Sequence, residues 1–282
     1  MKTSREHPSM VDGEVIGNVE VSPNHFRLTL RLPGTFSTPS PGQFVMIRDL
    51  ERREPLLPRP LSVYGFHREG GYAILVLLYR VAGLGTSLFS RLRSKAFLNV
   101  LGPLGRGFSV DCDVRRVILV AGGVGVAPLT FLLREGYSQT NASGKTQTTA
   151  YVGARTAELL TGLDRLESFC DLRIATNDGS AGHQGLVTDL VRSDLNGCNP
   201  EETFIYGCGP AAMIRSLGLL VRKTAIRCEV SIEERMACGI GACLGCAVAI
   251  TDGKGLSDYQ RVCKEGPVFN ILDISPVFFS NE

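Results

Sequence analysis

The feature that most constrains this chain is the spacing of four cysteines near its C-terminal end. They follow the pattern Cys238-x4-Cys243-x2-Cys246, and sixteen residues separate Cys246 from Cys263. This arrangement is typical of the thiolates that hold a plant-type [2Fe–2S] cluster. Glycines between the cysteines let a loop wrap closely and turn backbone N–H groups toward the sulfurs. We therefore predict that Cys238, Cys243, Cys246 and Cys263 bind such a cluster.

A zinc site and inert buried thiols are the other interpretations of these cysteines. Zinc sites favour paired C-x2-C elements, and this stretch contains one such pair. The segment Met1–Val15 is polar and lacks the apolar core of a signal peptide. An odd total of nine cysteines also fits a disulfide framework poorly. We expect a cytoplasmic protein with reduced thiols.

The first hundred residues predict β structure. Short runs rich in β-branched and aromatic residues alternate with turn signals such as Pro33-Gly34 and Pro41-Gly42. Strands at this spacing favour a small antiparallel barrel. The expected strands are Glu14–Val21, His25–Leu32, Gln43–Leu50, Arg59–His67 and Tyr72–Arg80, with a short helix at Thr86–Leu92.

The pattern changes near Arg115, where strands begin to alternate with helical segments. Such alternation predicts a mostly parallel sheet covered on both faces. The expected strands are Arg116–Ala121, Thr148–Val152, Leu172–Thr176 and Thr203–Tyr206, with a helix from about Ala127 to Arg134. The predicted fold is therefore mixed β and α/β, in three parts: an N-terminal antiparallel β-barrel at residues 10–108, a central parallel α/β nucleotide-binding domain at 109–226, and a small C-terminal [2Fe–2S] subdomain at 227–282.

Two partner classes are disfavoured. The formal charge of +2 argues against a broad nucleic-acid surface, which needs a local excess of Lys and Arg. The uncharged stretch Val117–Leu133 could suggest a membrane span, but glycines and Pro128 interrupt it. A strand, a tight turn and a helix start fit this stretch better than one continuous helix.

Two glycine-rich segments, Gly122–Pro128 and Tyr206–Pro210, each follow a predicted strand and precede a helical one. Glycines let the backbone approach a pyrophosphate, and a helix N-terminus offers unpaired N–H groups. A third turn, Thr176–Ser180, also follows a strand, and ligands of parallel sheets bind beyond the carboxyl ends of strands. Tight strand–helix packing is the alternative explanation, because the spacing departs from G-x-G-x-x-G. The candidate nucleotide contacts are Gly122, Gly123, Gly125, Ala127, Pro128, Asp178, Gly207, Cys208, Gly209 and Pro210.

The predicted barrel contains a further set of motifs. Arg59-Pro60-Leu61-Ser62 opens a strand, Leu78-Tyr79-Arg80 ends the next one, and Gly85-Thr86 starts the short helix. Arginine and a helix N-terminus both suit phosphate groups. Taken alone, such a tetrapeptide is too common to be specific.

In this order, the barrel motifs and the two glycine-rich segments resemble the ferredoxin-reductase superfamily over nearly the whole chain. The stretch Glu234–Cys246, together with Arg261–Phe269, closely resembles the electron-transfer subunit of class 1B dihydroorotate dehydrogenase. One departure from the wider superfamily is Leu61, which stands where an aromatic residue is frequent.

The resemblance implies cofactors and a partner. The four cysteines would hold the cluster, the nucleotide would be NAD, and Cys208 would lie near the nicotinamide. An FMN-containing catalytic subunit would oxidise dihydroorotate during pyrimidine biosynthesis, in a heterotetramer of two subunits of each kind. Electrons would run from FMN through the cluster and FAD to NAD, and no side chain would need to act as a strong acid or base. The FAD contacts would be Arg59, Pro60, Leu61, Ser62, Leu78, Tyr79, Arg80, Gly85 and Thr86.

Two other functions are open at this level. The same motifs would serve an NAD(P)H-dependent reductase subunit that works with ferredoxin, sulfide or hydrogenase modules. A redox sensor without turnover would keep the fold but would need an output domain, for which this chain has no room.

Overall fold

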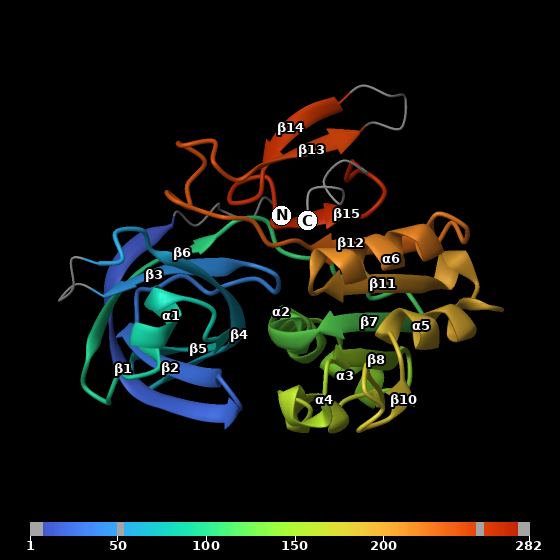
Figure 1. Ribbon diagram of the computed structural model, residues 1–282, viewed down its shortest axis with the longest axis horizontal. Coiled ribbons are helices and arrows are strands. Elements are labelled where there is room, and N and C mark those ends of the chain that lie inside the picture. The colour runs from blue at the N-terminus through green and yellow to red at the C-terminus, as the bar shows by residue number, and fades with distance from the viewer. Residues whose placement is uncertain (1–7, 50–53, 252–256, 276–282) are drawn as a thin grey trace.

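The computed structural model describes residues 8–49, 54–251 and 257–275. Figure 1 shows a barrel on one side and an α/β body on the other, with a small hairpin from the C-terminal part of the chain above them. No helix in these three ranges is long and apolar enough to span a membrane.

The barrel is built by the N-terminal part of the chain. Within the described residues, six strands close in the order β1-β2-β5-β4-β3-β6, and every neighbouring pair is antiparallel. Inward-facing residues such as Leu30, Leu75 and Val100 form its core. The barrel and its five predicted strands are confirmed, although Leu50 lies outside the described residues. The elements are β1 (Ser9–Ser22), β2 (His25–Pro33), β3 (Phe44–Asp49), β4 (Arg59–Glu69), β5 (Tyr72–Arg80), α1 (Leu84–Phe89) and β6 (Phe97–Leu104).

Strand β6 was not predicted from the sequence. Its residues alternate between exposed and buried positions, as a half-buried strand requires. However, the strand contains Gly102-Pro103, which in sequence resembles a turn. Here β6 pairs with both β1 and β3, so it closes the barrel.

The central body is a seven-stranded sheet, counted over the described residues, in the order β10-β9-β8-β7-β11-β12-β15. All its pairs are parallel except the one between β12 and β15. The predicted parallel α/β body is confirmed. Its strands are β7 (Arg116–Gly122), β8 (Gln147–Ala154), β9 (Asp171–Thr176), β10 (His183–Gln184), β11 (Thr203–Cys208), β12 (Arg227–Ser231) and β15 (Val268–Asn270). Its helices are α2 (Val126–Leu132), continued by a π-helical turn at Leu133–Tyr137, then α3 (Ser138–Ala142), α4 (Asp164–Glu167), α5 (Val187–Leu195) and α6 (Ala211–Val221), with 3₁₀ turns at Gly123–Gly125, Ala157–Leu159 and Pro200–Glu202.

The part of the chain after residue 226 does not stand apart from this sheet. Strands β12 and β15 both belong to it, whereas β13 (Ala247–Thr251) and β14 (Ser257–Arg261) form a separate antiparallel hairpin. The division of the chain at residues 108 and 226 stays a prediction.

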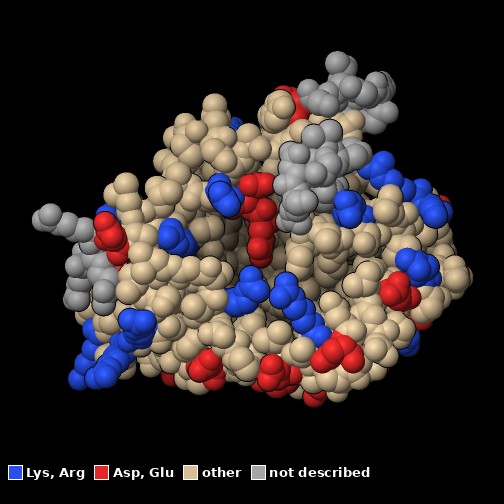
Figure 2. Space-filling view, in the orientation of Figure 1, with Lys and Arg blue, Asp and Glu red and all other residues tan. Residues whose placement is uncertain are grey.

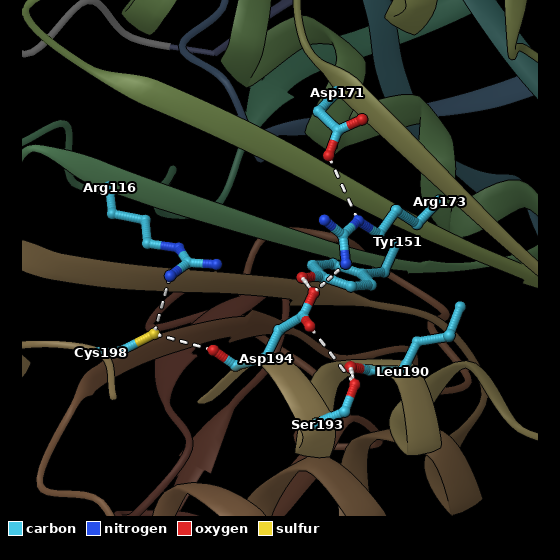
Figure 3. A network of polar contacts seen from close by, with 8 residues as sticks. All are labelled: Arg116, Tyr151, Asp171, Arg173, Leu190, Ser193, Asp194 and Cys198. Atoms are coloured by element: carbon cyan, nitrogen blue, oxygen red, sulfur yellow. Dashed lines mark hydrogen bonds and ion pairs between the residues drawn. The ribbon is translucent and has the colours of Figure 1, made fainter. Parts of the chain in front are cut away.

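Helix α5 is fixed to the sheet by the polar network in Figure 3. The Asp194 carboxylate, at the end of α5, accepts hydrogen bonds from the Tyr151 hydroxyl and from Arg173 Nη1, the latter at 2.5 Å. The backbone carbonyl of Asp194 accepts from the Cys198 thiol at 3.1 Å, and Arg116 Nη1 lies 3.2 Å from the same sulfur. Since Arg116 is the first residue of β7, the network braces the sheet away from the carboxyl ends of the strands.

The connection between barrel and sheet is clamped by polar groups. Ser109 donates from its backbone N and its hydroxyl to Glu229, at 2.8 and 2.7 Å. The Tyr206 hydroxyl donates to the Ser109 carbonyl at 2.7 Å and lies 2.6 Å from the Tyr137 hydroxyl. Burial raises the pKa of both tyrosines, so the pair stays neutral at physiological pH. The connecting segment is therefore held against β11 and β12.

We expect Tyr206→Phe to destabilise the protein by about 1–3 kcal/mol, because the buried Tyr137 hydroxyl then loses its hydrogen-bond partner. The midpoint of thermal unfolding of the purified protein, measured by calorimetry, should fall. Tyr259→Phe is the control, since Tyr259 is 71% exposed and the lost hydroxyl meets water. Equal midpoints for the two variants would contradict the role of Tyr206 in the clamp.

Candidate functional site

The two glycine-rich segments meet at one edge of the sheet, as predicted. Strands β7 and β11 pair in parallel with Ala121 opposite Cys208, so both segments leave the sheet at the same level. A Cβ atom at Gly125 would lie 2.1 Å from the Cys208 carbonyl oxygen, and one at Gly209 would lie 2.9 Å from the Gly122 nitrogen. Only glycine allows this close approach of backbone to backbone.

The third predicted segment lies along the same edge. Strand β9 ends at Thr176 beside the end of β8, and Asn177 N donates to the Ala154 carbonyl at 3.2 Å. Asp178 Oδ1 accepts from the Ser180 hydroxyl at 2.6 Å and from Ser180 N at 3.0 Å. These hydrogen bonds lower the pKa of Asp178, which is therefore ionised at neutral pH.

Cys208 lies at the end of β11 and is only 2% exposed. Burial raises the pKa of its thiol, the negative charge of Glu233 adds to this effect, and a hydrogen bond with Ser231 opposes it. The thiol is therefore protonated at neutral pH, and Cys208 is not an activated nucleophile. Its predicted place near a nicotinamide stays a prediction.

Sequence reasoning missed Glu233. Strand β12 pairs with β11 so that Ser231 lies opposite Cys208, and Glu233 follows two residues later. Burial raises the pKa of Glu233, whereas the charge of Arg80 on the barrel lowers it. The two side chains thus influence each other across the space between barrel and sheet. Figure 2 shows acidic side chains in the hollow at the centre of this face, with basic side chains around it. Glu233 was missed because it follows β12, a strand that was not predicted from the sequence.

The barrel motifs are also brought together. A Cβ atom at Gly85 would lie 2.5 Å from Arg59 Nε, so the Arg59 guanidinium lies over the start of α1. The Thr86 hydroxyl oxygen accepts from Ala82 N at 2.9 Å and from Gly83 N at 3.2 Å, which orders the turn before that helix. Pro60 and Ser62 lie on β4 opposite Met46 and Phe44 of β3.

The remaining predicted FAD contacts differ in where their side chains lie. Tyr79 is 2% exposed inside the barrel, where its ring stacks on Phe26 at 5.6 Å, so it can reach a ligand only through its backbone. Leu61 is partly buried against the same core. Leu78 points away from the barrel core and is 4% exposed. It lines a crevice of about 370 Å³ between barrel and sheet, with Arg27, Tyr64 and residues 160–164.

The four predicted ligand cysteines lie in two pairs. Cys238 lies close enough to Cys243 for the two thiols to affect the pKa of Cys238, and Cys246 affects the pKa of Cys263 in the same way. Burial raises the pKa of Cys238, but N–H groups of Ile240, Cys243 and Ala242 outweigh it and lower the pKa to about 6.

In the second pair, the pKa of Cys263 is shifted in the opposite direction from that of Cys238. Burial, the thiol of Cys246 and its charge raise the pKa of Cys263 to about 12. Neither Cys246 nor Cys263 is more than 2% exposed. Within the described residues, no three His, Cys, Asp or Glu side chains lie close enough together to hold one metal ion. Two thiol pairs suit a cluster of two irons, each of which takes two thiolates.

The loop between the first two cysteines fits closely against the barrel. Gly239 has a φ of +72°, and a Cβ atom there would lie 2.5 Å from Met46 Cγ. Gly241 has a φ of +81°, and its backbone N–H donates to Cys263 Sγ at 3.1 Å. Backbone N–H groups therefore point at sulfurs, as the glycine-rich spacing predicted. The donor set and these amides fit a [2Fe–2S] cluster.

Comparison with known proteins agrees with this geometry. Residues 233–275 match the iron–sulfur cluster binding domain of dihydroorotate dehydrogenase B, and residues 119–218 match an oxidoreductase NAD-binding domain. A solved NADH-dependent reduced ferredoxin-NADP oxidoreductase, described for flavin-based electron bifurcation, superposes with a TM-score of 0.78 and 26% identity, over 93% of this chain and 89% of that one. A ferredoxin NADP+ reductase from Neisseria gonorrhoeae with bound FAD and NADP shares the fold, with a TM-score of 0.61 and 16% identity, over 76% of this chain and 91% of that one.

Two curated relatives cover nearly the whole chain. The electron transfer subunit of dihydroorotate dehydrogenase B (NAD(+)) from Desulforamulus reducens is 38% identical, over 92% of this chain and 95% of its own length. The protein of the same name from Caldanaerobacter subterraneus is 36% identical, over 90% of this chain and 94% of its own length. Identity at this level over both chains, together with the paired cysteines, places the chain in the family of electron transfer subunits of NAD(+)-dependent dihydroorotate dehydrogenase B.

Proposed function

We propose that this chain carries electrons from a dihydroorotate-oxidising partner, through a [2Fe–2S] cluster and FAD, to NAD+ in pyrimidine biosynthesis. The observation that carries the proposal is the position of residues 233–275, which we call the cysteine segment. Cys246 and Cys263 pack in one hydrophobic cluster with Met46 and Leu104 of the barrel and Val230 of the sheet. The segment that matches the iron–sulfur domain thus contacts the two bodies that carry the FAD and NAD motifs.

The flavin supplies the conversion between one-electron exchange with a cluster and hydride exchange with a nicotinamide. The protein's part is to bind and orient. Arg59 and the start of α1 would hold the FAD phosphates, and the outer face of β4 and β5 would support the rest of the flavin. Tyr79 would contribute its backbone, since its ring is buried in the barrel.

The nucleotide would bind along the carboxyl edge of the sheet. The Gly122–Pro128 and Gly207–Pro210 segments would cradle the pyrophosphate, and Asp178 would accept hydrogen bonds from a ribose. Cys208 would contact the nicotinamide as a neutral thiol. Glu233 was not in the predicted set, but its position beyond Cys208 makes it a further candidate at this edge.

The partner would be the FMN-containing catalytic subunit, in a heterotetramer with two subunits of each kind. The name shared by the relatives, electron transfer subunit, supports a partner that performs the substrate chemistry. None of the nine cysteines, all of which lie in the described residues, forms a disulfide, which fits a cytoplasmic location. The domain boundaries at residues 108 and 226 belong to the same proposal.

The test is dihydroorotate-dependent reduction of NAD+, measured anaerobically with and without the FMN-bearing subunit from the same source. NADH should appear only when both subunits are present, because this chain has no dihydroorotate-oxidising site of its own under the proposal. If NADH does not form with both subunits, the proposed partner is wrong.

The likeness to the NADH-dependent ferredoxin-NADP oxidoreductase favours a second candidate, a reductase subunit that serves ferredoxin, sulfide or hydrogenase modules. In that case the chain should oxidise NADH or NADPH with an artificial acceptor, yet fail to couple to dihydroorotate. The two functions are therefore separated by the same assay.

Nucleotide preference provides a second prediction. The Asp178 carboxylate should repel the 2′-phosphate of NADPH, so Asp178→Asn should raise kcat/KM for NADPH relative to NADH about tenfold, equivalent to about 1.4 kcal/mol. The measurement is artificial-acceptor reduction with each nucleotide. Asp113→Asn is the matched control, since Asp113 is an exposed carboxylate paired with Lys145. An unchanged preference in Asp178→Asn would remove Asp178 from the ribose site.

A further inference from the structure

All three nitrogens of the Arg261 guanidinium donate hydrogen bonds within the cysteine segment. At the end of β14, its Nε donates to Glu265 Oε2 at 2.9 Å, and its Nη2 donates to Glu265 Oε1. The backbone N of Arg261 also donates to Glu265 Oε2, at 2.8 Å. A two-pronged arginine–carboxylate pair of this kind fixes the plane of the guanidinium. Both side chains are about 30% exposed, so the pair is partly shielded from water.

The remaining guanidinium nitrogen of Arg261 reaches the loop between Cys238 and Cys243. Arg261 Nη1 donates to the Gly241 carbonyl at 2.9 Å, across twenty residues of sequence. On the other side of the same residue, Gly241 N donates to Cys263 Sγ at 3.1 Å. Gly241 is thus held through its carbonyl by Arg261, while its N–H points at a predicted ligand sulfur.

Gly241 has no side chain that could restrict its backbone, and its conformation and surroundings favour glycine at this position. Its φ of +81° lies in the left-handed region, and a Cβ atom would approach Lys264 Cδ to 2.9 Å. Arg261 therefore supplies the restraint that the missing side chain cannot. No other hydrogen bond to the Gly241 carbonyl is present among the described residues.

A hydrogen bond to a ligand sulfur stabilises negative charge on that sulfur. A [2Fe–2S] cluster becomes more negative by one electron on reduction, and hydrogen bonds to the sulfurs are among the features that set its potential. An N–H group held on Cys263 Sγ therefore favours the reduced cluster over the oxidised one. No covalent bond forms or breaks in the protein during this change.

We propose that Arg261, anchored by Glu265, is a positioning residue that holds the Gly241 N–H on Cys263 Sγ and so raises the reduction potential of the cluster. This inference rests on the proposed function, which places the cluster on these cysteines. Its role is distinct from ligation, since Arg261 and Glu265 supply no thiolate and contact the loop through its backbone.

The test uses the full chain with its cluster, purified anaerobically, and two variants. Arg261→Lys keeps the positive charge but loses the fork, because a single ammonium group cannot hold Gly241 and both Glu265 oxygens in this geometry. Glu265→Gln keeps Arg261 but weakens its anchor. Both variants should retain wild-type iron and sulfide content. The midpoint potential of Arg261→Lys, from redox titration followed by electron paramagnetic resonance, should fall. That of Glu265→Gln should fall by less, because the loss of the Glu265 negative charge raises the potential while the loosened amide lowers it. For Arg261→Lys the ratio of reduced to oxidised cluster at a fixed potential should drop about tenfold, which is about 59 mV for one electron.

Lys264→Gln is the matched control. It removes a positive charge beside Gly241 but leaves the Arg261 fork intact, and Lys264 is exposed, so its charge is screened by water. A shift in Lys264→Gln as large as that in Arg261→Lys would show that the potential responds to any change of side chain beside this loop, which would overturn the inference. A wild-type potential in Arg261→Lys with full iron content would also overturn the inference.

A measurement on the wild-type protein covers the case in which a variant loses its cluster. By electron–nuclear double resonance, the reduced cluster should show a strongly coupled proton whose signal is lost after exchange into deuterium oxide. The absence of such a proton would overturn the inference. If the wild-type chain holds no iron at all, the proposed function fails instead, and that outcome is distinguishable from the others.

Discussion

The arrangement of the whole molecule depends on one short segment that follows the last predicted ligand cysteine, Cys263. Residues 266–270 touch each of the other parts of the chain. Strand β15 in this segment pairs with β12, with Phe269 opposite Val230, and so joins the sheet. At Gly105 of the barrel, a Cβ atom would lie 2.6 Å from the Gly266 carbonyl oxygen, and the Arg106 N–H donates to that same oxygen. Because the segment begins three residues after Cys263, the candidate cluster site is tied to both bodies at once.

This tie explains why a stretch too short for its own core is ordered. Val248 and Val262 of the cysteine segment are buried in a cluster that also contains Ile205 of the sheet and Phe44 of the barrel. Apolar area that the segment could not bury alone is removed from water at these shared contacts. Close approaches of backbone complete the packing, as at Gly239 against Met46 and at Gly125 against Cys208. These two glycines thus allow close contact between segments that lie far apart in the chain.

Several features could be read from the sequence because they are local. The Cys238-to-Cys263 spacing, the five N-terminal strands and the strand–turn–helix at Gly122–Pro128 each depend on residues close together in the chain. Features that depend on distant partners were missed. Strand β6 contains a Gly-Pro pair, which indicates a turn unless β1 and β3 are already there to pair with it. Strand β12 and its neighbour Glu233 became visible only once β11 and β15 lay on either side.

The sequence by itself determined the chemistry that this chain can carry. Four cysteines at a spacing typical of cluster binding, two glycine-rich segments after strands and an arginine at a strand start are fixed by residue type and short spacing. Only the tertiary structure decided how these groups meet: that Arg59 lies over Gly85, that Tyr79 turns its ring into the barrel, and that Arg261 reaches back to Gly241. The physical reason is that side-chain direction and long-range hydrogen bonds are set by packing between elements far apart in the chain, which no local pattern records.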